Sequence, residues 1–250
     1  MMNYLPFLII CPLTFLAGFV DSIAGGGGLI SLPAFLLAGL PSHSAIATNK
    51  LSSCIGTTVS TVRYCKNGFF DKMLAIPTII LALIGSAIGA HMVLLIDDCY
   101  LKWMMVIVLP IVAIAVLFHK SDNTTVPDFP PKKRLIIACA GAFTIGMYDG
   151  FYGPGTGTFI LLVLTALAHM DVRTASGNVK LINLSSNIAA LTTFLFSGNV
   201  NIILGLAGAS FCLCGHYIGS GMVMKGGNKV VKPIIILVLI LLFIKVFSGH

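Results

Sequence analysis

Residues 18–28, GFVDSIAGGGG, place one aspartate inside an apolar stretch and four consecutive glycines shortly behind it. A charged side chain is costly in hydrocarbon, and neighbouring glycines weaken any helix that contains them. Residues 146–156, GMYDGFYGPGT, repeat the arrangement, so that Asp21 aligns with Asp149 and Gly25 with Gly153. A sequence that carries this combination twice is expected to use it for function.

The composition is that of a membrane protein. Of the 250 residues, 57% are hydrophobic and 9% are charged, and the mean hydropathy is +1.01. Soluble domains carry roughly a quarter charged residues, so the chain is predicted to be an all-α polytopic membrane protein. Most of the basic residues lie in short loops between apolar runs, where they orient a membrane protein and do not indicate nucleic-acid binding.

Ten apolar segments follow one another along the chain. Eight are long enough to cross a bilayer core of about 30 Å: 4–24, 44–63, 73–96, 101–119, 134–152, 174–196, 201–224 and 232–248. The other two, 28–40 and 155–169, are too short, and each follows a glycine-rich break. They are predicted to be half-helices or re-entrant segments.

The two halves of the chain resemble each other beyond the glycine motifs. Lys50 aligns with Lys180, and the same offset relates Gly68 to Gly198 and Gly85 to Gly215. We therefore expect a first repeat at 1–119, a cytoplasmic linker at 120–133 and a second repeat at 134–250. The paired glycines Gly85/Gly89 and Gly215/Gly219 are expected to pack helices closely.

Loop charge predicts that the repeats have opposite orientations in the membrane. Loop 63–72 is basic and its counterpart 196–201 is uncharged, whereas loop 97–100 is acidic and its counterpart 225–232 is basic. By the positive-inside rule, loops 63–72, 120–134 and 225–232 are predicted to be cytoplasmic and both termini to lie outside. Inverted repeats with broken helices are typical of secondary transporters.

The helix breaks are candidate anion-binding elements. A helix that starts after a break presents backbone N–H groups and a partial positive charge, and glycine allows a ligand to approach the backbone. The two breaks are expected to meet between the halves, with two lysines adding positive charge and asparagines adding hydrogen bonds. The candidate substrate-binding residues are Asp21, Gly25, Gly26, Gly27, Gly28, Asn49, Lys50, Asp149, Gly153, Gly155, Gly157, Asn178, Lys180, Asn183 and Asn187.

The aspartates admit three interpretations. Asp21 pairs with Lys50 or Lys180 until substrate arrives, or the carboxylates carry protons that couple transport to a proton gradient, or they only bond loose N–H groups at the breaks. All three remain open at this level.

At these motifs the sequence resembles a known family. GFVDSIAGGGGLISLPAFLLAGL followed by ATNKL, then DGFYGPGTGTF and the later KLINLSSN, is similar to the TauE/SafE (TSUP) membrane proteins, especially their YfcA-like bacterial members. The resemblance implies a small transporter of the bacterial inner membrane, with about eight transmembrane helices in two related halves. It also implies a link with sulfite, sulfonates such as sulfoacetate, or other sulfur oxyanions.

The sequence therefore predicts a secondary transporter of small anions that works by alternating access. A passive anion channel and a membrane scaffold without transport activity are the alternatives. No nucleotide-binding motif and no nucleophile–base or metal-ligand constellation is evident, so we expect no enzyme activity, catalytic residue, metal or cofactor. The expected partners are a small anion, possible coupling protons and lipid, without nucleic acid, and a homo-oligomer is compatible with the sequence.

Overall fold

The computed structural model describes residues 4–101 and 129–226, and within these ranges it contains helices and no strands. This confirms the all-α prediction. The helices are α1 (Leu5–Ala24), α2 (Gly28–Leu37), α3 (Ser42–Lys66), α4 (Lys72–Leu94), α6 (Pro131–Phe151), α7 (Thr156–Leu162) with its π-helical continuation η1 (Val163–Leu167), α8 (Val172–Phe196) and α9 (Ile202–Gly226).

The helix ends follow local sequence signals. Asp71 caps α4 by accepting a hydrogen bond from the Met73 N–H, and Asp171 caps α8 through the Thr174 N–H. An aspartate at this position satisfies one of the N–H groups that a helix start leaves free. The linker prediction ended at residue 133, whereas α6 already begins at Pro131, because proline suits the first turn of a helix.

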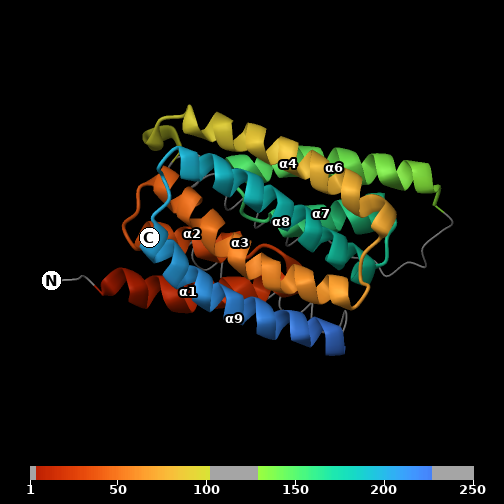
Figure 1. Cartoon of the computed structure of the whole chain (residues 1–250), viewed down its shortest axis with the longest axis horizontal. Helices are drawn as coiled ribbons and strands as arrows, with labels where there is room; N and C mark the ends of the chain where they lie inside the picture. The colour runs from red at the N-terminus through yellow and green to blue at the C-terminus, as the bar shows by residue number, and fades with distance from the viewer. Residues whose placement is uncertain (1–3, 102–128, 227–250) are drawn as a thin grey trace.

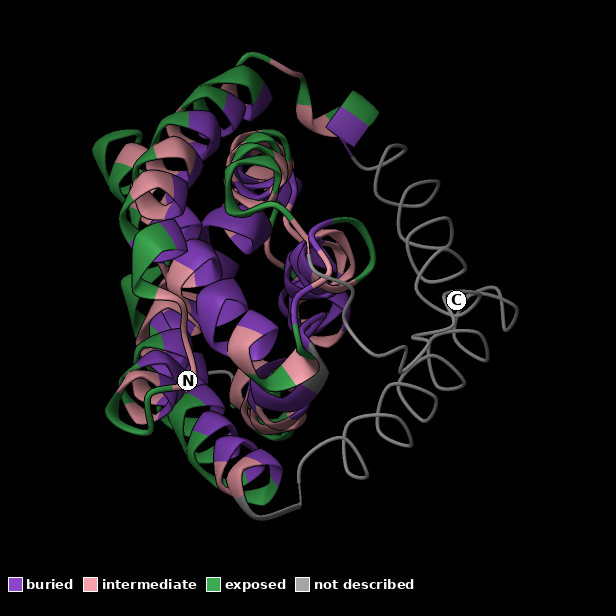
Figure 2. Cartoon of the chain, turned by 90° about the vertical axis from the view of Figure 1, so that its right-hand side faces the viewer, coloured by how far each residue is buried: buried purple, intermediate pink, exposed green. Residues whose placement is uncertain are grey.

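The helices form three layers, as Figure 1 shows. α4 and α6 make one outer layer, α1 and α9 make the other, and α3 and α8 lie between them with the short α2 and α7. The first long helix of each half therefore packs against the last described helix of the other half. Viewed along the helices, buried residues concentrate on the inward faces and exposed residues on the outer ones (Figure 2).

Glycines bring the outer helices together. A Cβ added at Gly85 or Gly89 of α4 would overlap the carbonyl oxygens of Phe143 and Met147 of α6. In the other outer layer, Gly215 and Gly219 of α9 lie in the same way against α1. The glycine pairs thus pack helices closely, as the sequence indicated.

α3 and α8 run antiparallel through the middle layer. At one end Ser44 of α3 donates a hydrogen bond to the carbonyl of Asn199, just after α8, at 2.7 Å. At the other end Arg173 of α8 lies over the ring of Phe69, just after α3, at 5.1 Å. This second end, which we call the basic end, carries Arg63, Lys66, Lys72, Lys132, Lys133, Arg134 and Arg173.

Four helices within the described ranges are long and apolar enough to cross a membrane: Leu5–Ile23, Lys72–Leu94, Val172–Phe196 and Ile202–Met224. α3 and α6 match two further predicted crossings in length, but polar residues lower their hydropathy. The predicted segments 101–119 and 232–248 lie almost wholly outside the described residues. The segments after the breaks form the short apolar helices Gly28–Leu37 and Thr156–Leu167, as their length in the sequence predicted.

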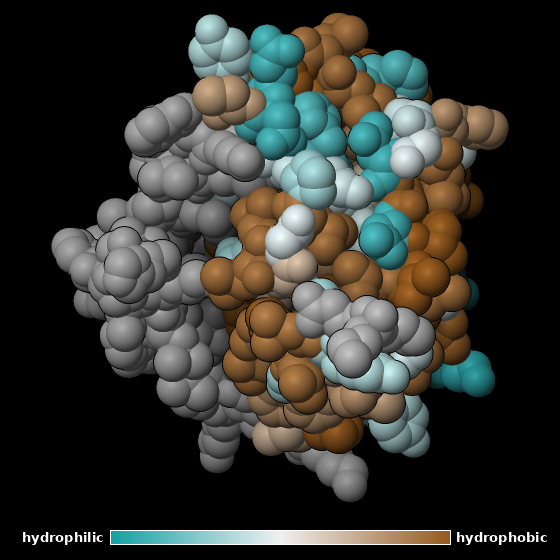
Figure 3. All heavy atoms as spheres, turned by 90° about the vertical axis from the view of Figure 1, so that its left-hand side faces the viewer, coloured by the Kyte–Doolittle hydropathy of each residue, from teal (hydrophilic) through white to brown (hydrophobic). Residues whose placement is uncertain are grey.

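The outer surface of the bundle is apolar. Along α4, Met73, Ile76, Ile80, Ile84, Ile88 and Met92 are all exposed, and they follow one another at helical spacing. Figure 3, viewed from the end at which α1 and α9 begin, shows hydrophilic residues gathered over part of the face and hydrophobic residues on its flank. Such a flank suits contact with lipid, because soluble proteins rarely expose apolar surface this extensively.

Candidate functional site

The two glycine-rich breaks touch each other in the centre of the molecule. α1 ends at Ala24 and α2 begins at Gly28, while α6 ends at Phe151 and α7 begins at Thr156. A Cβ added at Gly25 would lie 2.5 Å from the carbonyl carbon of Gly157. Gly25 also has a φ of 76°, and Gly153 has a φ of 97°. Residues other than glycine rarely adopt φ values in this region. Glycine is therefore required both for the turn and for the approach of the two halves.

An ion pair joins the halves on one side of this contact. Lys50 of α3 lies 2.8 Å from Asp149 Oδ1 of α6, and both side chains are at most 3% exposed. Ser186 of α8 donates a hydrogen bond to the other carboxylate oxygen of Asp149 at 2.6 Å. A buried charge is stable only when it is paired and hydrogen-bonded, so these contacts hold one another in place.

A second ion pair also joins the halves, with its lysine from the second half and its aspartate from the first. Lys180 of α8 lies 3.0 Å from Asp21 Oδ2 of α1 and also donates to the Asp21 backbone carbonyl. Asp21 Oδ1 accepts a hydrogen bond from the Gly27 N–H at 3.1 Å. Asp21 thus combines two of the three arrangements considered from the sequence, since it pairs with a lysine and caps the helix break.

The start of α2 has fewer free N–H groups than the sequence suggested. The Leu29 N–H bonds to the Gly26 carbonyl, and the N–H groups of Ile30 and Ser31 bond to the Gly27 carbonyl. Together with the bond from Gly27 to Asp21, these contacts satisfy most of the first turn. The positive charge available to an anion therefore comes chiefly from the lysines.

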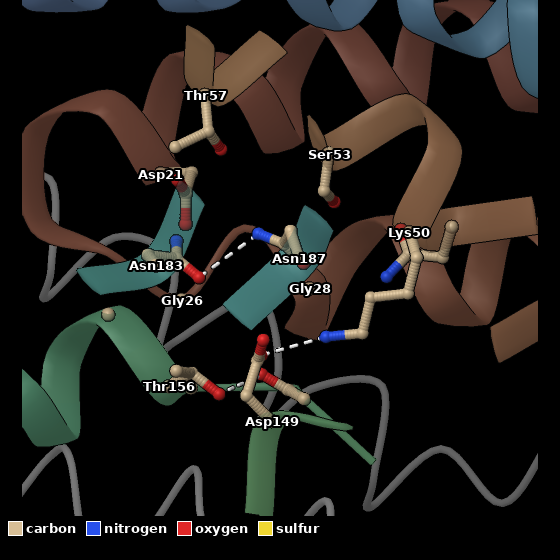
Figure 4. A pocket seen from close by; sticks show the side chains of 14 residues that line it. Asp21, Gly26, Gly28, Lys50, Ser53, Thr57, Asp149, Thr156, Asn183 and Asn187 are labelled. Carbon is tan, nitrogen blue, oxygen red and sulfur yellow. Dashed lines mark hydrogen bonds and ion pairs between the residues drawn. The ribbon is translucent and has the colours of Figure 1, made fainter. Parts of the chain in front are cut away.

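A small polar cavity lies between the breaks and the middle helices. Its volume is about 20 Å³, which is room for about one water molecule. Figure 4 shows Lys50, Ser53 and Thr57 on one side, with Asn183 and Asn187 of α8 and Thr156 of the second break on the others. The lining residues are Asp21, Gly26, Gly28, Asn49, Lys50, Ser53, Thr57, Asp149, Gly153, Gly155, Thr156, Gly157, Asn183 and Asn187.

Most of the candidate residues meet at this cavity, and four do not line it. Gly25 and Gly27 form the turn behind it, and Lys180 is turned toward Asp21. Asn178 instead donates a hydrogen bond to the Thr174 carbonyl within α8. The two lysines are therefore not equivalent, because Lys50 lines the cavity and Lys180 does not.

Two polar atoms beside the cavity lack a hydrogen-bond partner. They are Asn49 Oδ1 and Thr57 Oγ1, and both residues are at least 95% buried. A buried polar atom without a partner costs about 1 to 3 kcal/mol, so its presence at a cavity favours a site that water or a ligand fills. Within the described residues, no group of three or more His, Cys, Asp or Glu could hold a metal ion.

Comparison with known proteins establishes the family of this chain. A family model described as "Sulfite exporter TauE/SafE" matches residues 10–246. The chain belongs to the TauE/SafE family of membrane transporters.

Curated relatives of this TauE/SafE chain carry transporter names. It is 33% identical to "Probable membrane transporter protein ORF9" of Sinorhizobium sp, over 99% of this chain and 94% of that protein. It is 31% identical to "Probable membrane transporter protein YfcA" of Escherichia coli strain K12, over 89% of this chain and 82% of that protein. These matches confirm the predicted membership. No solved structure gave a significant match.

Sequence reasoning missed several residues at this TauE/SafE site. Ser53 and Thr57 line the cavity, and in the repeat they align with Asn183 and Asn187. Extending the register of Lys50 and Lys180 along their helices would have identified both.

His216 was also missed. It lies on α9, is 1% exposed, and its Nε2 is 3.7 Å from Asp21 Oδ2. Its aligned partner in the first half is Ser86, so the repeat pattern gave no signal for an imidazole at this position.

Proposed function

We propose that this transporter carries small anions, namely sulfur oxyanions or organosulfonates of the sulfite and sulfoacetate kind. The observation that carries the proposal is Lys50, a buried ammonium group that lines the cavity between the halves. A lysine supplies three hydrogen-bond donors and a full positive charge. Asn183, Asn187 and Thr57 line the same cavity and add neutral polar groups to it.

The anion competes with Asp149 for Lys50. In the ion-paired state the cavity has room for about one water molecule, which is less than a polyatomic oxyanion needs. Binding therefore requires that the pair separates or that the halves move apart. Either change links substrate binding to the contact between the two halves, as transport by alternating access requires.

Sulfur oxyanions enter the proposal through the family description, "Sulfite exporter TauE/SafE". The cavity chemistry supports the class and does not select one member of it. We further propose that the basic end faces the cytoplasm of a bacterial inner membrane, because basic residues gather at that end of the molecule.

A passive channel is a weaker candidate, because the two buried ion pairs and the touching glycine turns close the centre of the molecule. A channel needs a continuous water-filled path, whereas this cavity is small.

Uptake into proteoliposomes tests the proposal. The panel is sulfite, sulfate, thiosulfate, sulfoacetate and methanesulfonate, with taurine and acetate as chemical controls. We expect saturable uptake of at least one sulfur anion by the wild type and loss of that uptake, by about tenfold or more, in Lys50→Ala.

The matched control is Lys66→Ala, which removes an exposed lysine from the same helix. It should transport as the wild type does. Absence of uptake for every anion, or equal uptake by Lys50→Ala and the wild type, would contradict the proposed function. Conductance that does not saturate with concentration would instead favour the channel.

A further inference from the structure

The two ion pairs differ in what surrounds them. Beside Asp149, α8 and α4 each supply a hydroxyl: Ser186 donates to Asp149, and Ser86 donates to the Ser186 carbonyl at 2.6 Å. Beside Asp21 the residue that aligns with Ser86 is His216. One half-site therefore holds an ionisable imidazole where the other holds the Ser86 hydroxyl.

His216 is enclosed by groups from every helix packed around it. Asp21 of α1 lies 3.7 Å from its Nε2, and Ser60 of α3 lies 3.0 Å from its Nδ1. Lys180 of α8 pairs at 3.0 Å with Asp21 Oδ2, the same oxygen that His216 faces. Other titratable groups near this cluster, among the described residues, include Cys212 on α9 itself and Tyr64 and Arg63 on α3; the Tyr64 hydroxyl donates to the Ser22 carbonyl and Arg63 donates to Ser220.

The charges at the site sum to zero without substrate. The charged residues that line the cavity or pair with its lining, within the described ranges, are two aspartates and two lysines, and each lysine faces one aspartate. An anion that enters adds an uncompensated negative charge to a buried region, which is strongly unfavourable. A proton on His216 would compensate one such charge, and Asp21 is close enough to stabilise it.

We propose that His216, together with Asp21 and Lys180, is the proton-binding site of this transporter, so that one proton moves with each anion. The inference rests on the proposed function and deepens it by assigning the coupling ion and its position. Substrate binds on the side of Lys50 and Asp149, and the proton binds on the side of Asp21. Each event favours the other, because together they keep the buried region near neutrality.

The test measures proton and anion fluxes in the same proteoliposomes. The probe is whichever of sulfate, thiosulfate and methanesulfonate the uptake panel shows to be carried, since their charges do not change near neutral pH. Potassium and valinomycin hold the membrane potential at zero, and a trapped dye reports internal pH. With one proton per anion, an outside that is more acidic by about one pH unit should sustain up to about tenfold accumulation of the anion.

The decisive variant is His216→Gln, which keeps a hydrogen-bonding side chain beside Ser60 and cannot carry the proton. We expect it to lose proton uptake and the accumulation driven by the pH gradient, while exchange of labelled for unlabelled anion continues. His216→Ser, which reproduces the residue at position 86, should behave in the same way. His43→Gln, a histidine outside this cluster, should retain the coupling ratio of the wild type.

Three results would overturn the proposal. They are anion uptake by the wild type without proton movement, an unchanged proton-to-anion ratio in His216→Gln, and loss of exchange together with uptake in both folded variants. Lys50→Ala separates this inference from the proposed function, because it should lose exchange as well as uptake. If the wild type carries no anion of the panel, the proposed function fails first.

Discussion

Lys50 from the first half of the chain lies 2.8 Å from Asp149 of the second half, and Lys180 reciprocates with Asp21. Neither half can complete its own ion pair, because each lysine reaches across to the opposite break. The pairs can form only while the halves are in contact, so any motion that separates the halves must break or exchange the pairs.

Removing one partner of the cavity pair should destabilise the protein. Lys50→Ala leaves Asp149 buried without its counter-charge, at a cost of about 3 to 5 kcal/mol. Thermal unfolding in detergent should show a clear decrease of Tm. The double variant Lys50→Met with Asp149→Leu should recover most of the stability without recovering transport. A Lys50→Ala protein as stable as the wild type would refute the pairing.

Gly25 is expected to tolerate no side chain, because a side chain would strain the backbone and would also overlap the second break. A comparison with Gly39 separates these two effects. Gly25 and Gly39 have similar φ values, 76° and 91°, but a Cβ at Gly25 would meet Gly157 at 2.5–2.8 Å, whereas nothing lies within 4 Å of one at Gly39. Gly39→Ala should therefore cost only the backbone strain, about 1 kcal/mol.

Gly25→Ala should cost considerably more, because it also forces the two breaks apart. The measurement is the Tm of each variant in detergent, together with anion uptake. Equal losses in the two variants would mean that the contact between the breaks adds nothing beyond the conformation of the turn.

Labelling of single cysteines should establish the orientation of the basic end. In a background without native cysteines, Lys66→Cys and Lys132→Cys lie at the same end of the molecule, and Asn199→Cys lies at the other. We expect an impermeant maleimide to label Asn199→Cys in intact cells, and Lys66→Cys and Lys132→Cys only after the membrane is opened. Labelling of positions 66 and 132 from opposite sides would contradict the inverted arrangement of the repeats.

Asp98 should make stability depend on acidity. It lies beyond α4 and accepts hydrogen bonds from the Ser42 hydroxyl and the His43 N–H, both at 3.2 Å. Partial burial disfavours its charge, but the hydrogen bonds from His43 and Ser42 outweigh burial and lower the pKa of Asp98 from its usual 3.8. A lowered pKa means that this stabilisation is complete above pH 3.8 and is lost as the pH falls through the pKa of the folded protein.

The comparison is between the wild type and Asp98→Asn, with Asp97→Asn as a control that removes the neighbouring charge. The Tm difference caused by Asp98→Asn should be present near neutral pH and should diminish as the pH falls below 3.8. A difference that is independent of pH would show that the ionised carboxylate is not what stabilises this connection.

The sequence by itself determined the fold class, the positions of the helix breaks and the short helices after them. These properties are local: hydropathy separates apolar segments from loops, and glycine accepts the φ values found at Gly25 and Gly153 far more readily than other residues do. The repeat also predicted that the breaks would meet, which the contact between Gly25 and Gly157 bears out in the structure. The inversion of the two repeats across the membrane stays a prediction.

Only the tertiary structure decided which charges pair and which line the cavity. Asp21 had two candidate lysines in the sequence, and the antiparallel packing of α3 and α8 gives it Lys180. The proximity of His216 to Asp21 follows only from the packing of α9 against α1, because the two residues are far apart in the chain. Side-chain pairs of this kind depend on the distance between helices from opposite halves, and no local pattern of residues encodes that distance.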